Sequence, residues 1–163
     1  GEIKIQRGKP RHSLEIANLI NRLSKPSQTL SPDDIMAAFG EKAFFLLYIN
    51  YKLMGVIGWQ VENLVTRVLD LHFDESVNLV DVLPVLINEI EQASADLQAE
   101  AALLSFPETY RVATSVWQKL GYKAVQPREL SVSAWHEAAQ EMNTPASLLY
   151  FKQLRQDRVL RPI

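Results

Sequence analysis

Apolar side chains recur at regular spacing in the first part of the chain, and the spacing changes from strand-like to helix-like. Residues 3–7 alternate apolar and polar side chains, which predicts a short, half-buried strand. A helix should begin after Ser31, since Pro32 suits the first helical position and Asp34 completes a capping box. Before it, an amphipathic helix is expected, because four apolar residues follow i, i+3, i+4, i+7 spacing: Ile16, Leu19, Ile20 and Leu23.

Three apolar runs in the middle of the chain predict a meander of antiparallel strands. The runs cover residues 43–51, 53–61 and 64–73, and they are rich in the aromatic and branched side chains that strands favour. Turns are expected at Tyr51-Lys52 and at Glu62-Asn63. These strands should form the middle of a sheet.

The last part of the chain alternates helices and strands. Apolar residues from Asp81 onward repeat at spacings of three and four, which predicts a helix. Its N-cap should lie at or near Asp81, because Pro84 is tolerated only in the first turn. Gly121 should end the next helix as a left-handed C-cap. That helix is expected to turn five residues inward: Val112, Ala113, Val116, Trp117 and Leu120. Strands at 101–106, 122–125 and 148–154 and a helix at 133–142 complete the predicted order.

Composition limits the domain organisation and the partners. The 163 residues, 47% of them hydrophobic, suit one domain with a single core. Gly1 in place of a methionine is compatible with a domain cut from a longer protein. The formal net charge of -2 gives no field that attracts nucleic acid or a membrane, so neither is expected as a partner. With no cysteine and no apolar run of membrane-spanning length, we expect a cytoplasmic protein.

The segment between the third strand of the meander and the following helix contains no glycine. None occurs between Gly58 and Gly121, although glycine is the residue that lets a backbone approach a phosphate closely. Residues 69–84 instead carry four carboxylates: Asp70, Asp74, Glu75 and Asp81. This junction therefore disfavours phosphate binding.

The order of elements, together with residues 113–122 (Ala-Thr-Ser-Val-Trp-Gln-Lys-Leu-Gly-Tyr), resembles the GNAT superfamily of N-acyltransferases. The resemblance extends over nearly the whole chain. It implies an α/β (α+β) fold with a mixed, mostly antiparallel central sheet flanked by helices. It also implies acyl transfer from acetyl-CoA to an amine.

The motif that binds the cofactor in this family is degenerate here. GNAT enzymes carry Gln/Arg-x-x-Gly-x-Gly/Ala at the start of the third helix, where backbone N–H groups bind the pyrophosphate of acyl-CoA. Alignment of the apolar helix residues puts Asn78, Asp81 and Leu83 at these positions. The aspartate would repel phosphates and the leucine would block their close approach. No cofactor is therefore expected.

Candidate catalytic residues are few. Many GNAT enzymes use a tyrosine as general acid four residues before the terminal glycine, whereas this chain has Trp117, which is expected to be a packing residue. His72 and Glu62 are weak candidates for a general base, and a polar residue on a half-solvated strand is the simpler interpretation of each. Neither His12 nor His136 has a second ligand at suitable spacing, so no metal site is expected.

Two functional hypotheses follow. The first is a degenerate, non-catalytic domain that acts as a regulatory module and binds a protein or a small ligand. The alternative is a divergent N-acetyltransferase that uses acetyl-CoA. Under the first hypothesis a sheet edge or the aromatic residues of the central hairpin should contact a protein partner or a second copy in a homodimer: Phe44, Phe45, Tyr48, Tyr51 and Trp59.

Overall fold

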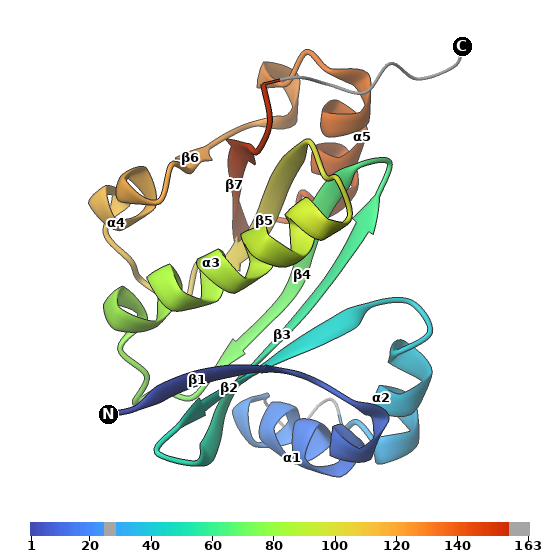
Figure 1. The fold of residues 1–163 in the computed structure, drawn as a ribbon, viewed down its shortest axis with the longest axis vertical. Coiled ribbons are helices and arrows are strands. Elements are labelled where there is room, and N and C mark those ends of the chain that lie inside the picture. The colour runs from blue at the N-terminus through green and yellow to red at the C-terminus, as the bar shows by residue number, and fades with distance from the viewer. Residues whose placement is uncertain (25–28, 157–163) are drawn as a thin grey trace. The chain divides into compact units, whose positions relative to one another are not determined.

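The computed structural model describes residues 1–24 and 29–156, and it shows an α/β fold built on a mixed, mostly antiparallel sheet (Figure 1). The seven strands are hydrogen-bonded in the order β1-β2-β3-β4-β5-β7-β6. Strands β4 and β5 pair in parallel, whereas β1–β2, β2–β3, β5–β7 and β6–β7 pair antiparallel. The strands are β1 Ile3–Arg7, β2 Ala43–Ile49, β3 Lys52–Glu62, β4 Val65–Phe73, β5 Ala101–Pro107, β6 Lys123–Ala124 and β7 Ser147–Gln153. The α-helices are α1 Ser13–Leu23, α2 Pro32–Ala38, α3 Leu79–Asp96, α4 Thr114–Lys119 and α5 Ser133–Met142.

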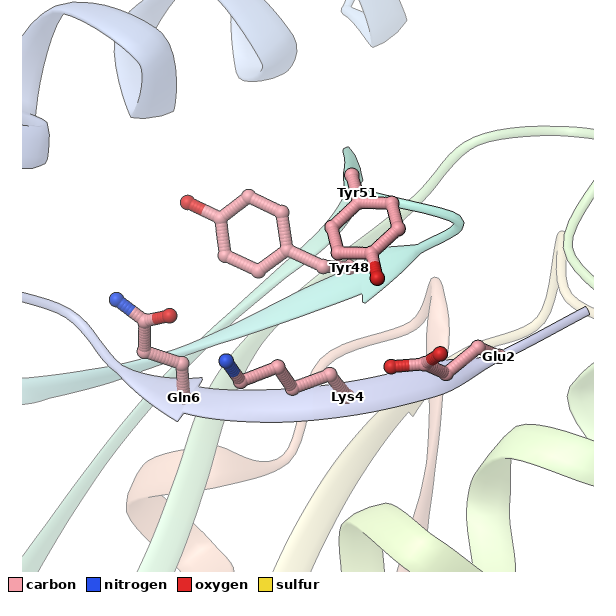
Figure 2. A pocket seen from close by; sticks show the side chains of 5 residues that line it. All are labelled: Glu2, Lys4, Gln6, Tyr48 and Tyr51. Carbon is pink, nitrogen blue, oxygen red and sulfur yellow. The ribbon is translucent and has the colours of Figure 1, made fainter.

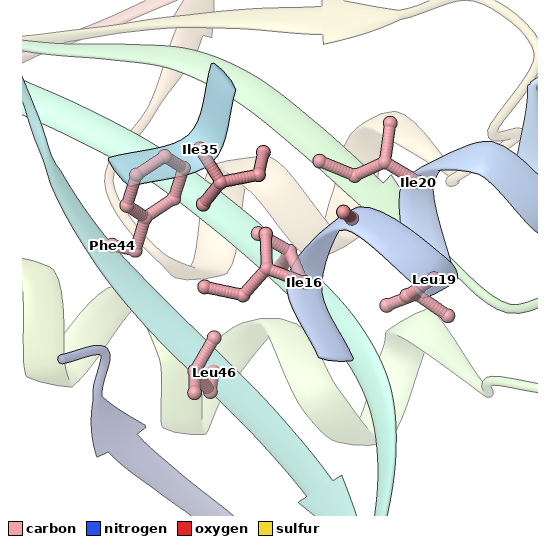
Figure 3. Packing of buried hydrophobic residues seen from close by; sticks show 8 residues of the cluster. Ile16, Leu19, Ile20, Ile35, Phe44 and Leu46 are labelled. Carbon is pink, nitrogen blue, oxygen red and sulfur yellow. The ribbon is translucent and has the colours of Figure 1, made fainter. Parts of the chain in front are cut away.

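The chain forms two compact units, and the first comprises residues 1–60 and 69–86. In this unit α1 and α2 pack on strands β2 and β3, because the apolar faces of both helices meet alternate strand residues. Ile16 of α1, Ile35 of α2 and Leu46 of β2 are almost fully buried in this cluster (Figure 3). Burial of such side chains contributes about 1.5–3 kcal/mol each, so this cluster holds the helices on the sheet.

The second unit comprises residues 61–68 and the described chain from Ile87 onward. Successive residues of β7 contact different helices: Tyr150 stacks on Trp117 of α4, with ring centroids 4.2 Å apart, and Phe151 contacts Trp135 of α5. Since successive strand residues point to opposite faces, helices cover both faces of the sheet here. Trp117 is fully buried, which confirms its prediction as a packing residue.

Several local predictions are confirmed. The Ser31 hydroxyl accepts a hydrogen bond from the Asp34 N–H, and the Asp34 carboxylate accepts one from the Ser31 N–H, which completes the capping box. Gly121 has a φ of 88°, the left-handed conformation expected after α4. The end predicted for the first helix, near Lys25-Pro26, lies outside the described residues.

Two helix predictions were wrong. Helix α3 begins at Leu79, before the predicted N-cap, and Pro84 therefore lies in its second turn. Helix α4 begins only at Thr114, so Val112 and Ala113 precede it and do not form its inward face. In the first case the polar side chain of Asn78 offers an earlier cap than the hydrophobic pattern indicates.

The aromatic residues of the central hairpin are less exposed than expected. Phe44, Phe45 and Trp59 are each at least 96% buried, and Tyr48 is half-buried. Tyr51 alone of this group is exposed, with 88% of its surface accessible. The predicted aromatic contact surface is therefore reduced to the end of the hairpin.

Candidate functional site

The turn between β4 and α3 is held by a carboxylate of the chain itself. Asp74 accepts hydrogen bonds from the N–H and the hydroxyl of Ser76, at 3.0 and 2.7 Å, through Oδ1. Its Oδ2 lies 2.6 Å from the guanidinium of Arg22. The backbone hydrogen bond from Ser76 and the contact with Arg22 lower the pKa of Asp74 to about 2. A negative charge is therefore fixed in this turn at neutral pH.

The first N–H groups of α3 also have partners within the chain. The Asn78 side-chain oxygen accepts from the N–H of Val80 at 3.1 Å, and the Asn78 carbonyl accepts from Asp81 and Val82. The N–H groups of Val80 and Asp81 are among the donors that an anion would use at a helix N-terminus. In this turn they bind groups of the protein instead.

The three positions of the degenerate motif differ in exposure. Asn78 and Asp81 are exposed, whereas the side chain of Leu83 is completely buried. Leu83 therefore does not obstruct an approach to the helix N-terminus from solvent, and the expected steric block has no structural support. Repulsion by Asp81, in the first turn of α3, stays a prediction.

A pocket of about 160 Å³ in the first unit brings together residues from α1, α2, β2 and β4. Its polar lining includes Lys42, Asp70 and His72, and Asp34 lies at the same pocket. Lys42 Nζ lies 2.5 Å from Asp70 Oδ2, so the ammonium and the carboxylate neutralise each other. The apolar lining consists of Ile20, Leu30, Ile35, Ala38 and Phe44.

His72 is the titratable group of this pocket that is suited to proton transfer. Burial lowers the pKa of His72, and this effect exceeds the opposite influence of the Asp70 carboxylate. The imidazole is therefore neutral at pH 7 and has a lone pair that can accept a proton. His72, a candidate base predicted from the sequence, thus lies in a pocket. The pocket exists because α2 packs on the sheet near β4.

Gly58 of β3 makes room for the ion pair beside this pocket. A Cβ at Gly58 would lie 2.6 Å from Asp70 Oδ2 and 3.2 Å from Lys42 Cδ. Since real Cβ atoms do not approach that closely, any larger residue would displace the Asp70 carboxylate. Asp70 and Lys42 together are the local reason for glycine at this strand position.

The second candidate base, Glu62, lies in the second unit and contacts an arginine. Its Oε2 is 3.7 Å from Arg67, which is only 5% exposed and also pairs with Glu141 of α5. The buried guanidinium requires such partners, because an unpaired buried charge is strongly destabilising. Glu62 is thus placed to neutralise Arg67.

Two kinds of feature are missing from the described residues. Within residues 1–24 and 29–156, no group of three or more His, Asp and Glu side chains could hold a metal ion. No helix in that part of the chain is long and apolar enough to cross a membrane.

The sequence matches no protein-family model and no curated protein. The fold, in contrast, is similar to many solved structures. A GNAT-family acetyltransferase from Staphylococcus aureus Mu50 superimposes with a TM-score of 0.67 at 14% identity, over 94% of this chain and all of that one. YncA from Salmonella typhimurium, a putative acetyltransferase solved with acetyl-CoA, gives 0.68 at 8% identity over 100% of both chains. PaiA N-acetyltransferase from Thermoplasma acidophilum, solved with coenzyme A, gives 0.61 at 13% identity over 94% of this chain and 99% of that one. The protein therefore has the fold of the GNAT superfamily.

Proposed function

We propose that this protein is a non-catalytic GNAT-fold domain that acts as a regulatory binding module. The observation that carries the proposal is the β4–α3 turn, where Asp74 and Asn78 occupy backbone N–H groups with the chain's own oxygens. A pyrophosphate would have to displace these side chains before it could use the same donors. The protein partner, or a second copy of the chain, would then bind elsewhere on the domain.

Charge supports the same proposal. Asp74 is held in its ionised form, and Glu75 and Asp81 are exposed on the same turn, with Arg22 as the one cation paired to it among the described residues. Each carboxylate near a bound phosphate would contribute a repulsion of about 1–4 kcal/mol at 4 Å. The turn therefore disfavours a ligand as strongly charged as coenzyme A.

The alternative function, N-acetyl transfer from acetyl-CoA to an amine, is favoured by the pocket around His72. Solved relatives by fold contain coenzyme A or acetyl-CoA. A neutral His72 could take the proton of an ammonium substrate, and the free amine would then attack the thioester carbonyl. The thiolate of coenzyme A would leave and take up the proton that the nitrogen loses as the amide forms. The cofactor would need to be bound without the usual pyrophosphate contacts.

Titration calorimetry with acetyl-CoA separates the two functions. A ligand that binds only the folded state stabilises it and raises the melting temperature. For the non-catalytic module, which should not bind acetyl-CoA, we therefore expect no heat of binding and no rise in melting temperature at millimolar cofactor. Asp81→Asn tests the repulsion directly, with Glu129→Gln on the second unit as the matched charge control. Binding of acetyl-CoA to the unchanged protein in the micromolar range would overturn the proposal.

A further inference from the structure

Strand β1 forms one end of the sheet, and its pairing with β2 leaves a row of its backbone groups without a strand partner among the described residues. The carbonyl of Glu2 accepts from the Asn50 N–H at 3.1 Å, and the Gly8 N–H donates to Phe44 at 2.8 Å. Since bonded residues alternate in an antiparallel pair, the even-numbered residues of β1 bond to β2. The N–H and C=O groups of Ile3, Ile5 and Arg7 therefore point away from the sheet.

The even-numbered side chains of β1 form a polar row beside two tyrosines. Glu2, Lys4 and Gln6 line a pocket of about 200 Å³ together with Tyr48 and Tyr51 (Figure 2). Glu2 and Lys4 are both exposed, and neither takes part in an ion pair within the described residues. Opposite charges thus stand two residues apart on an open strand edge.

Tyr51 adds an aromatic ring to the same end of the strand. It occupies the second central position of the β2–β3 turn with a φ of 67°, where glycine is strongly preferred. The residue is 88% exposed, so packing within the described chain does not compensate the unfavourable backbone conformation. A residue that is both strained and exposed points to a role at the surface.

We infer that β1 pairs in antiparallel register with β1 of a second copy, about a twofold axis at Ile3. In this register Glu2 lies opposite Lys4 of the second copy, and Lys4 lies opposite its Glu2. The inference deepens the self-association part of the proposed function, and it does not depend on whether the domain binds acetyl-CoA.

The charges select this register among those that the outward backbone groups allow. An axis at Glu2 or at Lys4 would oppose two like charges, which destabilises a strand pair. An axis at Ile5 would place Lys4 opposite Gln6 and Ile3 opposite Arg7, with no charge paired. The axis at Ile3 pairs Glu2 with Lys4 twice, at non-hydrogen-bonded positions where side chains lie closest. The interface is short, so a concentration-dependent dimer is expected rather than an obligate one.

Sedimentation equilibrium from about 1 to several hundred micromolar protein tests the inference. We expect the unchanged protein to dimerise, and Lys4→Glu to weaken the dimer by about tenfold, because two attractive pairs become repulsive. The double variant Glu2→Lys/Lys4→Glu reverses both charges and should restore most of the affinity. A strictly monomeric protein, or a double variant as weak as Lys4→Glu, would overturn the register and the inference.

Two further variants separate pairing from unrelated effects. Ile5→Pro removes an N–H that points away from β2, so the fold should persist and the dimer should be lost. Lys119→Glu in α4 makes the same change of charge in the second unit and should leave dimerisation unchanged. Equal weakening by Lys119→Glu would show a net-charge effect and contradict the inference. Loss of dimerisation would not affect the acetyl-CoA titration, so the two proposals fail separately.

Discussion

Two hairpin turns of this protein adopt the same unfavourable backbone conformation, but the bulky residue is half-buried in one turn and exposed in the other. Asn50-Tyr51 joins β2 to β3, and Asn63-Leu64 joins β3 to β4; all four residues have φ between 50° and 67°. Leu64 is half-buried, and its carbonyl accepts the Glu100 N–H at 2.7 Å. Tyr51 is exposed and lines an open pocket. Packing and a hydrogen bond account for a bulky residue in one turn, whereas burial does not account for it in the other.

Aromatic residues of the two units show a similar contrast. In the second unit, Trp117, Tyr150 and Phe106 pack against one another in the core. In the first unit, Tyr51 has no such contact among the ring pairs of the described residues. An aromatic residue in the sequence therefore does not by itself indicate an interaction surface, because its burial must be known first.

The largest effect is expected for Trp117→Ala. Removal of the fully buried indole should lower the free energy of unfolding by about 3–5 kcal/mol, because the stack on Tyr150 is lost and a cavity remains. Urea titration followed by circular dichroism measures this change. Tyr51→Ala is the control and should change stability by less than about 0.5 kcal/mol. Similar losses in both variants would break the contrast between the two units.

Glycine at each turn tests whether the two backbones are strained alike. Tyr51→Gly should raise the free energy of unfolding by about 1 kcal/mol, because glycine accepts a positive φ without steric penalty. Leu64→Gly relieves the same strain but loses half-buried apolar surface, so its net gain should be smaller or negative. The same urea titrations measure both. An equal gain at both turns would show that packing does not explain Leu64.

The contribution of Asp74 to the stability of the fold is smaller and should depend on pH. The pKa of Asp74 falls from an ordinary 3.8 to about 2 in the folded protein, so its ionised form stabilises the fold above about pH 4. This contribution, about 1 kcal/mol after solvent screening, should be lost as the pH falls from about 4 to about 2. Asp74→Asn should therefore be less stable than the unchanged protein at pH 6 and nearly equal at pH 2. Glu75→Gln should show no such convergence, and convergence in both variants would contradict the assignment to Asp74.

Most of the fold could be predicted from the sequence, because its signals are local. The capping box at Ser31 and the glycine after α4 depend on a few neighbouring residues. The start of α3 was missed, since the hydrophobic repeat marks which residues face the core and says little about the polar residue that caps a helix. The prediction placed the first hairpin turn at Tyr51-Lys52, one residue too late. Asn50 was a usable signal for the correct position, because asparagine between two apolar runs favours a turn.

The candidate sites were harder to predict, because they depend on residues far apart in sequence. His72 was identified as a possible base, but its pocket requires Lys42 and α2 to lie against β4. The contact of Glu62 with Arg67 involves Glu141 as well, on a helix that follows much later in the chain. No periodicity within one element reports such neighbours.

The order of β5, β7 and β6 bears on how the protein folds during its synthesis. The strand that pairs with both β5 and β6 is β7, and it is the last of the three to leave the ribosome. Until residues 147–153 emerge, one edge of β5 has no neighbour in the sheet and β6 has no strand to join. Such an open edge can pair with another chain. Strands β1 to β3, which are neighbours in sequence and in the sheet, meet no comparable delay, so the first unit is expected to assemble on the nascent chain before the second.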